Sequence, residues 1–186
     1  MSSLGTRASG APAESVELVE TYVEMWNTRD LSAIPELVTD GFVMYDPAAP
    51  ERGVAGPKGE VHGREGLRQF LEGVTTGYPD FEVEVLDLLA DEAGAFYEVR
   101  LRGTHEGNLN GLPPTGRRMD VRGVSKLTFE DGRVTEHRVY FDTRGVMEQL
   151  GMTFPTVLFQ FPKLLVGGAP RRTLRTAPGF GRRRGL

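Results

Sequence analysis

Apolar side chains recur at helical spacing in the first part of the chain. In "SVELVETYVEMWNT", which starts at Ser15, they form the single stripe that is typical of an amphipathic helix. Ser15 or Glu14 stands where an N-cap is expected, and Asn27 lies near the exit. The stripe consists of Val16, Val19, Val23 and Trp26, with Tyr22 beside it.

Two further helices are predicted before the chain changes period. Asp30 is placed to cap a short one, "LSAIPELV". Between the two, "GFVMYDP" indicates a brief strand ended by Pro47, and a loop rich in Gly and Pro follows over about residues 47–61. The third helix is "GREGLRQFLEGVTTG", and its inward side chains are Leu67, Phe70, Leu71 and Val74.

From Phe81 onward, apolar and polar residues alternate with the period of two that indicates strands. The segment "FEVEVLDLLADEAG" is followed by "AFYEVRLRGTH", "RMDVRGVSKLTFEDG" and "RVTEHRVYFD". Glu130, Asp131 and Gly132 give a strong tight-turn signal before the last strand. This strand leads into "TRGVMEQLG", a short helix stopped by Gly151. Helices followed by four successive antiparallel strands predict an α+β fold, in which a curved sheet wraps over the helices.

Composition divides the chain into a body and two tails. Residues 1–13 are rich in Ser, Gly, Ala and Pro and are expected to be disordered, whereas residues 14–152 are expected to form one domain. Residues 153–186 form an extension that holds seven of the 22 basic side chains and none of the 26 acidic ones. Its apolar part is too short to span a bilayer, and we expect it to pack on the domain or to join the interface of a homodimer or higher homo-oligomer. The basic part is expected to be a solvated tail, and the alternative is that it adds affinity for a membrane surface.

The composition argues against several classes of protein. The 186 residues include no cysteine, which excludes disulfides and thiolate nucleophiles, and three scattered histidines predict no metal site. No apolar run is long enough for a membrane span, and the N-terminus lacks the apolar core of a signal peptide, so a cytoplasmic location is expected. Phosphate-loop, dinucleotide-binding and G-x-S-x-G motifs are missing. No cofactor and no nucleic-acid partner are expected.

His105 is the first candidate for a functional site. It ends a strand whose residues of matching parity, from Ala95 to Gly103, are apolar or small, so its side chain should point to the same face as the core. A pocket between a curved sheet and its helices would be mostly apolar with a few polar groups. His105 is therefore either one of those polar groups or a cap for the turn that follows.

Asp142 is the second candidate, because it ends the last strand and precedes a helix. One interpretation is a helix N-cap. The other is a carboxyl group at the mouth of the pocket, where apolar surroundings would raise its pKa towards the range useful for proton transfer. Asp46, before Pro47, is open to the same kind of choice between turn former and pocket group, and its position favours the turn former.

The second half of the body resembles the SnoaL-like polyketide cyclase family, whose members are often called ester cyclases, within the NTF2-like superfamily. The matching motifs are G-T-H-x-G, G-x-P-P-T-G-R, F-x-D-G-x-[IV]-x-E, the strand-end aspartate and Q-L-G. Upstream, "YVEMWNTRDLSAIPELV", "YDP" and "VHGREGLRQFL" match in order and spacing. The resemblance covers about residues 14–152.

This resemblance implies an NTF2-like α+β cone, in which a strongly curved antiparallel sheet surrounds a deep apolar pocket closed by helices. It also implies an enzyme that closes a ring in a hydrophobic, carbonyl-containing small molecule by a cofactor-independent intramolecular aldol reaction. Asp142 matches the family's acid/base carboxylate, and His105 matches the histidine of its G-T-H motif, which would hydrogen-bond the oxygen on which charge grows. Contacts with the substrate are expected from Tyr140, Arg138, Tyr45, Asp46 and Trp26.

Two departures from the family pattern bear on the substrate. Arg138 stands where many relatives carry an aromatic residue, and Tyr45 stands where they often carry histidine. Both changes would alter the polarity of the pocket. The same kind of pocket would also serve an isomerase, a dehydratase or an epoxide hydrolase, or a module that binds a small molecule without catalysis, so the sequence leaves these alternatives open.

Overall fold

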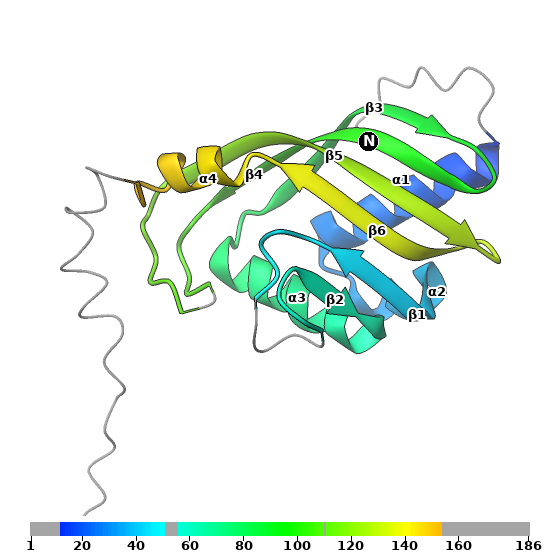
Figure 1. Ribbon diagram of the computed structural model, residues 1–186, viewed down its shortest axis with the longest axis horizontal. Coiled ribbons are helices and arrows are strands. Elements are labelled where there is room, and N and C mark those ends of the chain that lie inside the picture. Colours follow the sequence, from blue (N-terminus) through cyan, green and yellow to red (C-terminus); the bar gives the residue numbers. More distant parts are fainter. Residues whose placement is uncertain (1–11, 51–55, 110, 154–186) are drawn as a thin grey trace, which may run out of the picture.

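Helices cover one face of a six-stranded sheet in the computed structural model, which describes residues 12–50, 56–109 and 111–153 (Figure 1). The helices are α1 (Ala13–Thr28), the 3-10 turn η1 (Leu31–Ala33), α2 (Ile34–Leu37), α3 (Gly63–Gly77) and α4 (Thr143–Gln149). The strands are β1 (Val38–Tyr45), β2 (Glu60–His62), β3 (Glu82–Ala90), β4 (Gly94–Thr104), β5 (Arg118–Glu130) and β6 (Arg133–Phe141). The predicted α+β class is confirmed.

The strand order β2-β1-β6-β5-β4-β3 fixes which strand ends lie together. Strands β3, β4, β5 and β6 pair antiparallel in succession, as the sequence predicts. The pairing of β1 with β6 is parallel, with Met44 opposite His137. Strands β1, β4 and β6 therefore run in the same direction, and their C-terminal ends point the same way.

Helix α1 buries the predicted stripe against the inner face of the sheet, with Val19 and Tyr22 fully buried. The predicted cap at Ser15 or Glu14 is wrong, because the helix already begins at Ala13 and the amide of Ser15 donates to the carbonyl of Pro12 at 3.1 Å. Ser15 is thus a buried residue of the first turn.

At its other end α1 is fastened to the edge strand β3. The Asn27 side-chain amide donates to the carbonyl of Val83 at 2.9 Å and accepts from the amide of the same residue at 2.8 Å. The Asn27 side chain therefore bonds to β3 as a neighbouring strand would, and β3 is the edge strand of the sheet that the described residues form.

Several local predictions are confirmed by the structure. Helix α3 has the predicted bounds, and Asp30 caps η1 by accepting from the amide of Ser32 at 3.1 Å. The turn between β5 and β6 has two residues in the left-handed region, Asp131 (φ 49°) and Gly132 (φ 71°), which suits the twist of a tight hairpin. Gly151 (φ 72°) follows the end of α4.

The loop predicted over residues 47–61 is only partly correct. Residues 60–62 form the short strand β2, which pairs with β1 through Met44 and Val61. Three residues carry too little alternation to be recognised as a strand, and their partner lies in a different part of the sequence. The two predicted tails lie almost entirely outside the described residues.

Candidate functional site

Three polar residues follow the C-terminal ends of three strands that run the same way. Asp46 follows β1, His105 follows β4 and Asp142 follows β6. The topology thus points the ends of these strands the same way, but the ends are staggered. Tyr45 aligns through β6 and β5 with Phe96, nine residues before His105 on β4. The three side chains differ in burial, which separates their chemistry: Asp46 and His105 are buried, whereas Asp142 is exposed.

Asp46 combines a turn-forming role with an unusual environment. Its Oδ1 accepts from the amide of Ala48 at 2.7 Å, as expected of a turn former after a strand. The residue has the inward parity of Phe42 and Met44 and is only 7% exposed. Burial raises the pKa of its carboxyl group to about 6, although the Ala48 amide opposes the shift. A carboxyl group with this pKa exchanges its proton close to neutral pH.

His105 is fully buried at the end of β4 and packs against the ring of Tyr78, with centroids 5.2 Å apart. Burial lowers the pKa of its imidazole, so the ring is neutral at physiological pH. The amide of Thr115 donates to Nδ1 at 3.3 Å, which identifies Nδ1 as the acceptor and places the proton on Nε2. Within the described part of the chain, Nε2 has no hydrogen-bond partner. His105 therefore holds a buried N–H donor that is available to a ligand oxygen.

Asp142 lies on the surface as the N-cap of α4. Its Oδ1 accepts from the amide of Gly145 at 2.9 Å, the bond expected of an aspartate before a helix. The strand before Asp142 runs in the same direction as the strand before His105, but Asp142 does not lie among the buried polar side chains.

A chain of polar contacts crosses the core between α1, β6 and β5. The Tyr22 hydroxyl lies 3.1 Å from Nδ1 of His137, and Nε2 of His137 lies 3.1 Å from the hydroxyl of Ser125. Burial lowers the pKa of His137 to about 3, so its imidazole is neutral. A neutral imidazole offers one donor and one acceptor, and both nitrogens of His137 are satisfied by hydroxyl groups.

Two buried phenols belong to this region: Tyr22, which is part of the network, and Tyr97, which adjoins it. Burial raises the pKa of Tyr22, and the nearby Tyr97 and Asp46 raise it further. Burial also raises the pKa of Tyr97, which stands opposite Ser125 in the sheet. Both hydroxyl groups keep their protons at neutral pH, so they can act as hydrogen-bond donors on the inner face.

Of the residues expected to contact substrate, Trp26 lies on the inner side. It is 6% exposed and forms an aromatic cluster with Phe70 and Phe81, at centroid distances of 6.2 and 6.3 Å. This cluster gives the inner face the apolar character that a hydrophobic ligand requires.

Like Trp26, Asp46 lies on the inner side, whereas the three remaining expected contacts lie on the opposite face of the sheet. The Arg138 guanidinium is 4.0 Å from the ring centroid of Tyr45 and bonds to Glu136 at 2.8 Å, while Tyr140 is 58% exposed. Arg138 and Tyr140 have the parity opposite to that of His137 on β6, and Tyr45 on β1 pairs with Arg138. The structure therefore separates Arg138, Tyr140 and Tyr45 from the buried groups.

The sequence interpretation did not single out Tyr22, Tyr97, Ser125 or His137 as site residues. One signal was available for His137, whose parity matches that of the buried Val139. The contact with Tyr22 joins residues 115 positions apart, and no local pattern reports such a pairing.

Across residues 12–50, 56–109 and 111–153, no group of acidic and histidine side chains is arranged to hold a metal ion. None of the helices in that part of the chain combines the length and the apolar character that crossing a membrane requires.

Comparison with protein families gives a match to the SnoaL-like polyketide cyclases over residues 16–150. Among characterised relatives, the aklanonic acid methyl ester cyclase DauD of Streptomyces sp. (strain C5) is 27% identical over 143 residues, or 76% of this chain and 84% of DauD. The nogalonic acid methyl ester cyclase of Streptomyces nogalater is 28% identical over 136 residues, or 72% of this chain and 94% of that protein.

Solved structures give the same picture of the fold. A protein from Jannaschia sp. CCS1, described as a SnoaL-like polyketide cyclase, superposes with a TM-score of 0.65 at 27% identity and covers 81% of this chain and 100% of its own. AclR from Streptomyces galilaeus, described as a hydroxylase, has a TM-score of 0.61 at 30% identity and covers 76% and 98%. These similarities confirm the expected fold family.

Proposed function

The chain belongs to the SnoaL-like polyketide cyclase family, and we propose that it closes a carbon ring in a hydrophobic polyketide ester without a cofactor. Relatives named as methyl ester cyclases of aklanonic and nogalonic acid support an enzyme of the cyclase type. The buried aromatic side chains of the inner face, Trp26, Phe70 and Phe81, suit a flat apolar substrate.

The observation that carries the proposed chemistry is the buried carboxyl group of Asp46. Its pKa of about 6 leaves the carboxyl group mostly ionised at neutral pH, and it makes the carboxylate a stronger base than an ordinary aspartate. Such a group can remove a proton from a carbon next to a carbonyl and return it later in the same cycle. Asp142 is an exposed cap, and we therefore assign the proton transfer to Asp46 rather than to the aspartate that the family resemblance implied.

His105 supplies the complementary group in this proposal. Its Nε2–H is buried and faces no acceptor within the described residues. A substrate carbonyl oxygen bound there would become more negative as the enolate forms, and a fixed donor in a dry site stabilises that charge.

The proposed reaction is an intramolecular aldol addition, in which every atom of the substrate is kept in the product. The Asp46 carboxylate takes a proton from the carbon next to a carbonyl, and the resulting enolate carbon bonds to a second carbonyl carbon of the same molecule. The alkoxide that forms on the second carbonyl then receives the proton from Asp46. Substrate and product are isomers, and no external oxidant or reductant is needed.

The test is a comparison of Asp46→Asn with Asp142→Asn, using aklanonic acid methyl ester as substrate. We expect Asp46→Asn to lower kcat by about 10²- to 10⁴-fold, because a positioned acid/base is lost. Asp142→Asn should keep near-normal turnover, since asparagine is also an effective cap. Full activity in Asp46→Asn, or selective loss in Asp142→Asn, would overturn the assignment.

Mass spectrometry of the product separates ring closure from the alternatives. An aldol product has the same mass as the substrate, a dehydratase product has lost water, and the product of a hydroxylase or epoxide hydrolase has gained oxygen or water. An isomeric product with a new ring supports the proposal. Tight binding without any conversion would instead favour a non-catalytic binding module.

A further inference from the structure

The buried network between α1 and the sheet contains one hydroxyl proton more than its own contacts can use. Ser125 hydrogen-bonds to Tyr97, which stands opposite it on β4. With the two contacts of His137, this gives a chain of three links from Tyr22 through His137 and Ser125 to Tyr97. Three hydroxyl groups and one neutral imidazole bring four protons, and each link uses one of them. The phenol at one end of the chain therefore keeps an O–H that no member of the chain accepts.

The direction of the hydrogen bonds decides which phenol this is. The Trp26 side chain hydrogen-bonds to Tyr22, and an indole N–H can only donate. Tyr22 is fully buried, so its own proton needs an acceptor, and Nδ1 of His137 at 3.1 Å provides one. The proton of His137 is then on Nε2 and donates to Ser125, and the Ser125 proton donates to Tyr97. The unused O–H therefore belongs to Tyr97.

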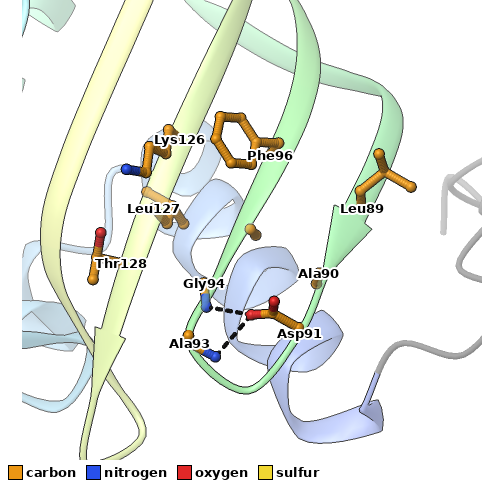
Figure 2. Close-up of a pocket in the computed structure, with 10 residues that line it drawn as sticks. Leu89, Ala90, Asp91, Ala93, Gly94, Phe96, Lys126, Leu127 and Thr128 are labelled. Carbon is orange, nitrogen blue, oxygen red and sulfur yellow. Dashed lines mark hydrogen bonds between the residues drawn. The ribbon is translucent and has the colours of Figure 1, made fainter.

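The side chains of Tyr97 and Ser125 point to the inner face of the sheet. Figure 2 shows their neighbours Phe96 and Lys126 on the side of β4 and β5 that faces away from α1. Because successive side chains of a strand point to opposite faces, Tyr97 and Ser125 face the helices, and each is only 3% exposed. Among the described residues, Ser125 is the one hydrogen-bond partner of the Tyr97 hydroxyl. Its O–H is therefore available to a ligand oxygen on the inner face.

Tyr97 lies in the same inter-strand row as Asp46, the proposed base. Asp46 follows the last paired residue of β1 and comes beside Val139 on β6. Val139 pairs with Ser125, and Ser125 pairs with Tyr97. Burial raises the pKa of Tyr22, and both Tyr97 and Asp46 lie near enough to raise it further. The phenol and the carboxyl group thus adjoin the same part of the inner face.

The proposed aldol reaction has a second oxygen that needs a donor. When the enolate carbon attacks the second carbonyl, the oxygen of that carbonyl becomes an alkoxide. Because the attacking carbon is the one that gave its proton to Asp46, this oxygen forms close to the base. His105 is assigned to the other oxygen, and it follows Tyr97 by eight residues along β4, so the two donors contact different oxygens of the substrate.

We propose that Tyr97 is a further catalytic residue, whose O–H donates to the carbonyl oxygen that the enolate attacks, and that His137 and Ser125 are positioning residues for it. This inference rests on the proposed function. Negative charge grows on that oxygen as the new bond forms, and a fixed donor in a dry site stabilises it. Burial raises the pKa of Tyr97, so the phenol keeps its proton while Asp46 protonates the alkoxide.

The first test is the turnover of aklanonic acid methyl ester by Tyr97→Phe. We expect kcat to fall by about 10²- to 10³-fold, the usual loss when one donor to a developing oxyanion is removed. KM should rise by less than about fivefold, because a hydrogen bond to a neutral carbonyl contributes little to binding. Tyr140→Phe, a matched change on the opposite face, should keep the wild-type kcat. A wild-type kcat in Tyr97→Phe would overturn the proposal.

Ser125→Ala tests whether the network acts through Tyr97. The variant keeps the phenol but loses the group that orients its proton, so kcat should fall by about tenfold. The double variant Ser125→Ala/Tyr97→Phe should be no slower than Tyr97→Phe alone, because Ser125 has no further role once the O–H is gone. Losses that add in the double variant would show that Ser125 acts on the fold, and would overturn its positioning role.

The direction of the hydrogen bonds can be measured in the unmodified protein. Long-range proton–nitrogen correlation spectra of ¹⁵N-histidine-labelled protein distinguish the two tautomers of each imidazole. The signals that disappear in His137→Gln assign this ring among the three histidines of the chain. We expect the proton of His137 on Nε2 at pH 7. A proton on Nδ1 would leave the unused O–H on Tyr22 and would overturn the proposal.

Substrate binding separates a failure of this inference from a failure of the proposed function. Trp26 is the only tryptophan of the chain, and its fluorescence should report binding of the ester on the inner face. If wild type and Tyr97→Phe convert the ester equally well, only the role of Tyr97 fails. If wild type binds the ester without converting it, the proposed function fails. Tyr97→Phe should then still raise the dissociation constant by about fivefold, and an unchanged constant would overturn the contact with Tyr97 as well. If wild type neither binds nor converts the ester, both proposals fail.

Discussion

The hydroxyl of Tyr22 and Nδ1 of His137 lie 3.1 Å apart in the core, and this contact joins α1 to the last strand of the sheet. The Tyr22 and His137 rings also meet edge to face, with centroids 5.6 Å apart. Because both residues are buried, neither can replace the other with water when the pair is broken. The contact therefore fastens the helix layer to the sheet and holds a neutral imidazole in place.

Tyr22→Phe should destabilise the protein. The change removes one hydroxyl and leaves a buried nitrogen of His137 without its partner, which costs about 1–3 kcal/mol of unfolding free energy. The measurement is urea-induced unfolding, with Tyr140→Phe as the matched control because Tyr140 is 58% exposed. Equal losses in the two variants would contradict the structural role of the Tyr22–His137 contact.

Acidification should unfold the protein partly through His137. Its pKa is about 3 in the folded chain and near the ordinary 6.5 when unfolded, so between these values only the unfolded state binds the proton. Stability is therefore lost as the pH falls from about 6.5 towards 3, by up to several kcal/mol. His137→Gln removes the titrating group, and its unfolding free energy should depend less on pH in this window. An unchanged pH dependence would contradict the prediction.

Asp46 should make the unfolding free energy depend on pH in the opposite direction to His137. Its pKa is raised from 3.8 to about 6 by burial, so the folded state holds a proton that the unfolded state has lost. This contribution favours folding at pH 4 and is lost as the pH rises through about 6. Asp46→Asn should therefore be more stable than wild type at pH 8, by at most about 3 kcal/mol, and nearly equal to it at pH 4. Denaturant unfolding at the two pH values measures the difference, and equal gains at both would contradict it.

Much of the sheet could be predicted because its signals are local. The alternation from Ala95 to His105 reports which side chains face the core, and Asp131 and Gly132 report the hairpin between β5 and β6. The parallel pairing of β1 with β6 joins segments about 95 residues apart in sequence, as the pair Val38 and Val134 shows. Such a pairing depends on how the whole chain packs, and no periodicity within either strand specifies it.

The candidate site was only partly predictable for the same reason. Strand parity correctly placed His105 among the buried residues. Asp46 and Asp142 both end strands, but the strand before Asp142 carries polar residues on both faces, so its sequence does not show which face is covered. The difference arises from packing: a helix begins directly after Asp142 and takes its side chain as a cap, whereas Asp46 is buried at the end of β1.

The capping role of Asp142 can be measured separately from catalysis. Asp142→Ala removes the acceptor for the Gly145 amide and should cost about 1 kcal/mol, whereas Asp142→Ser retains an acceptor and should cost less. Thermal unfolding of the two variants gives the comparison. If both variants matched wild type in stability, the Asp142–Gly145 hydrogen bond would contribute nothing to the fold.

The segment that follows His105 is held against the end of α3, and Gly107 is the residue that permits this close approach. Its amide donates to the carbonyl of Gly77 at 3.1 Å, and a Cβ at this position would collide with the carbonyl oxygen of Thr76. Gly107→Ala must therefore push this segment away from α3, and we expect a loss of about 1–3 kcal/mol in the unfolding free energy. Turnover should also fall, because His105 is only two residues away.

Gly73→Ala is the matched control for Gly107→Ala. Gly73 lies inside α3, and a Cβ there would meet nothing within 4 Å. Alanine at this position reduces the conformational freedom of the unfolded chain and suits a helix, so the variant should gain about 0.5–1 kcal/mol. The denaturant midpoints of the two variants should thus shift in opposite directions from that of wild type. If Gly107→Ala were as stable as wild type, the segment would not depend on its contact with α3.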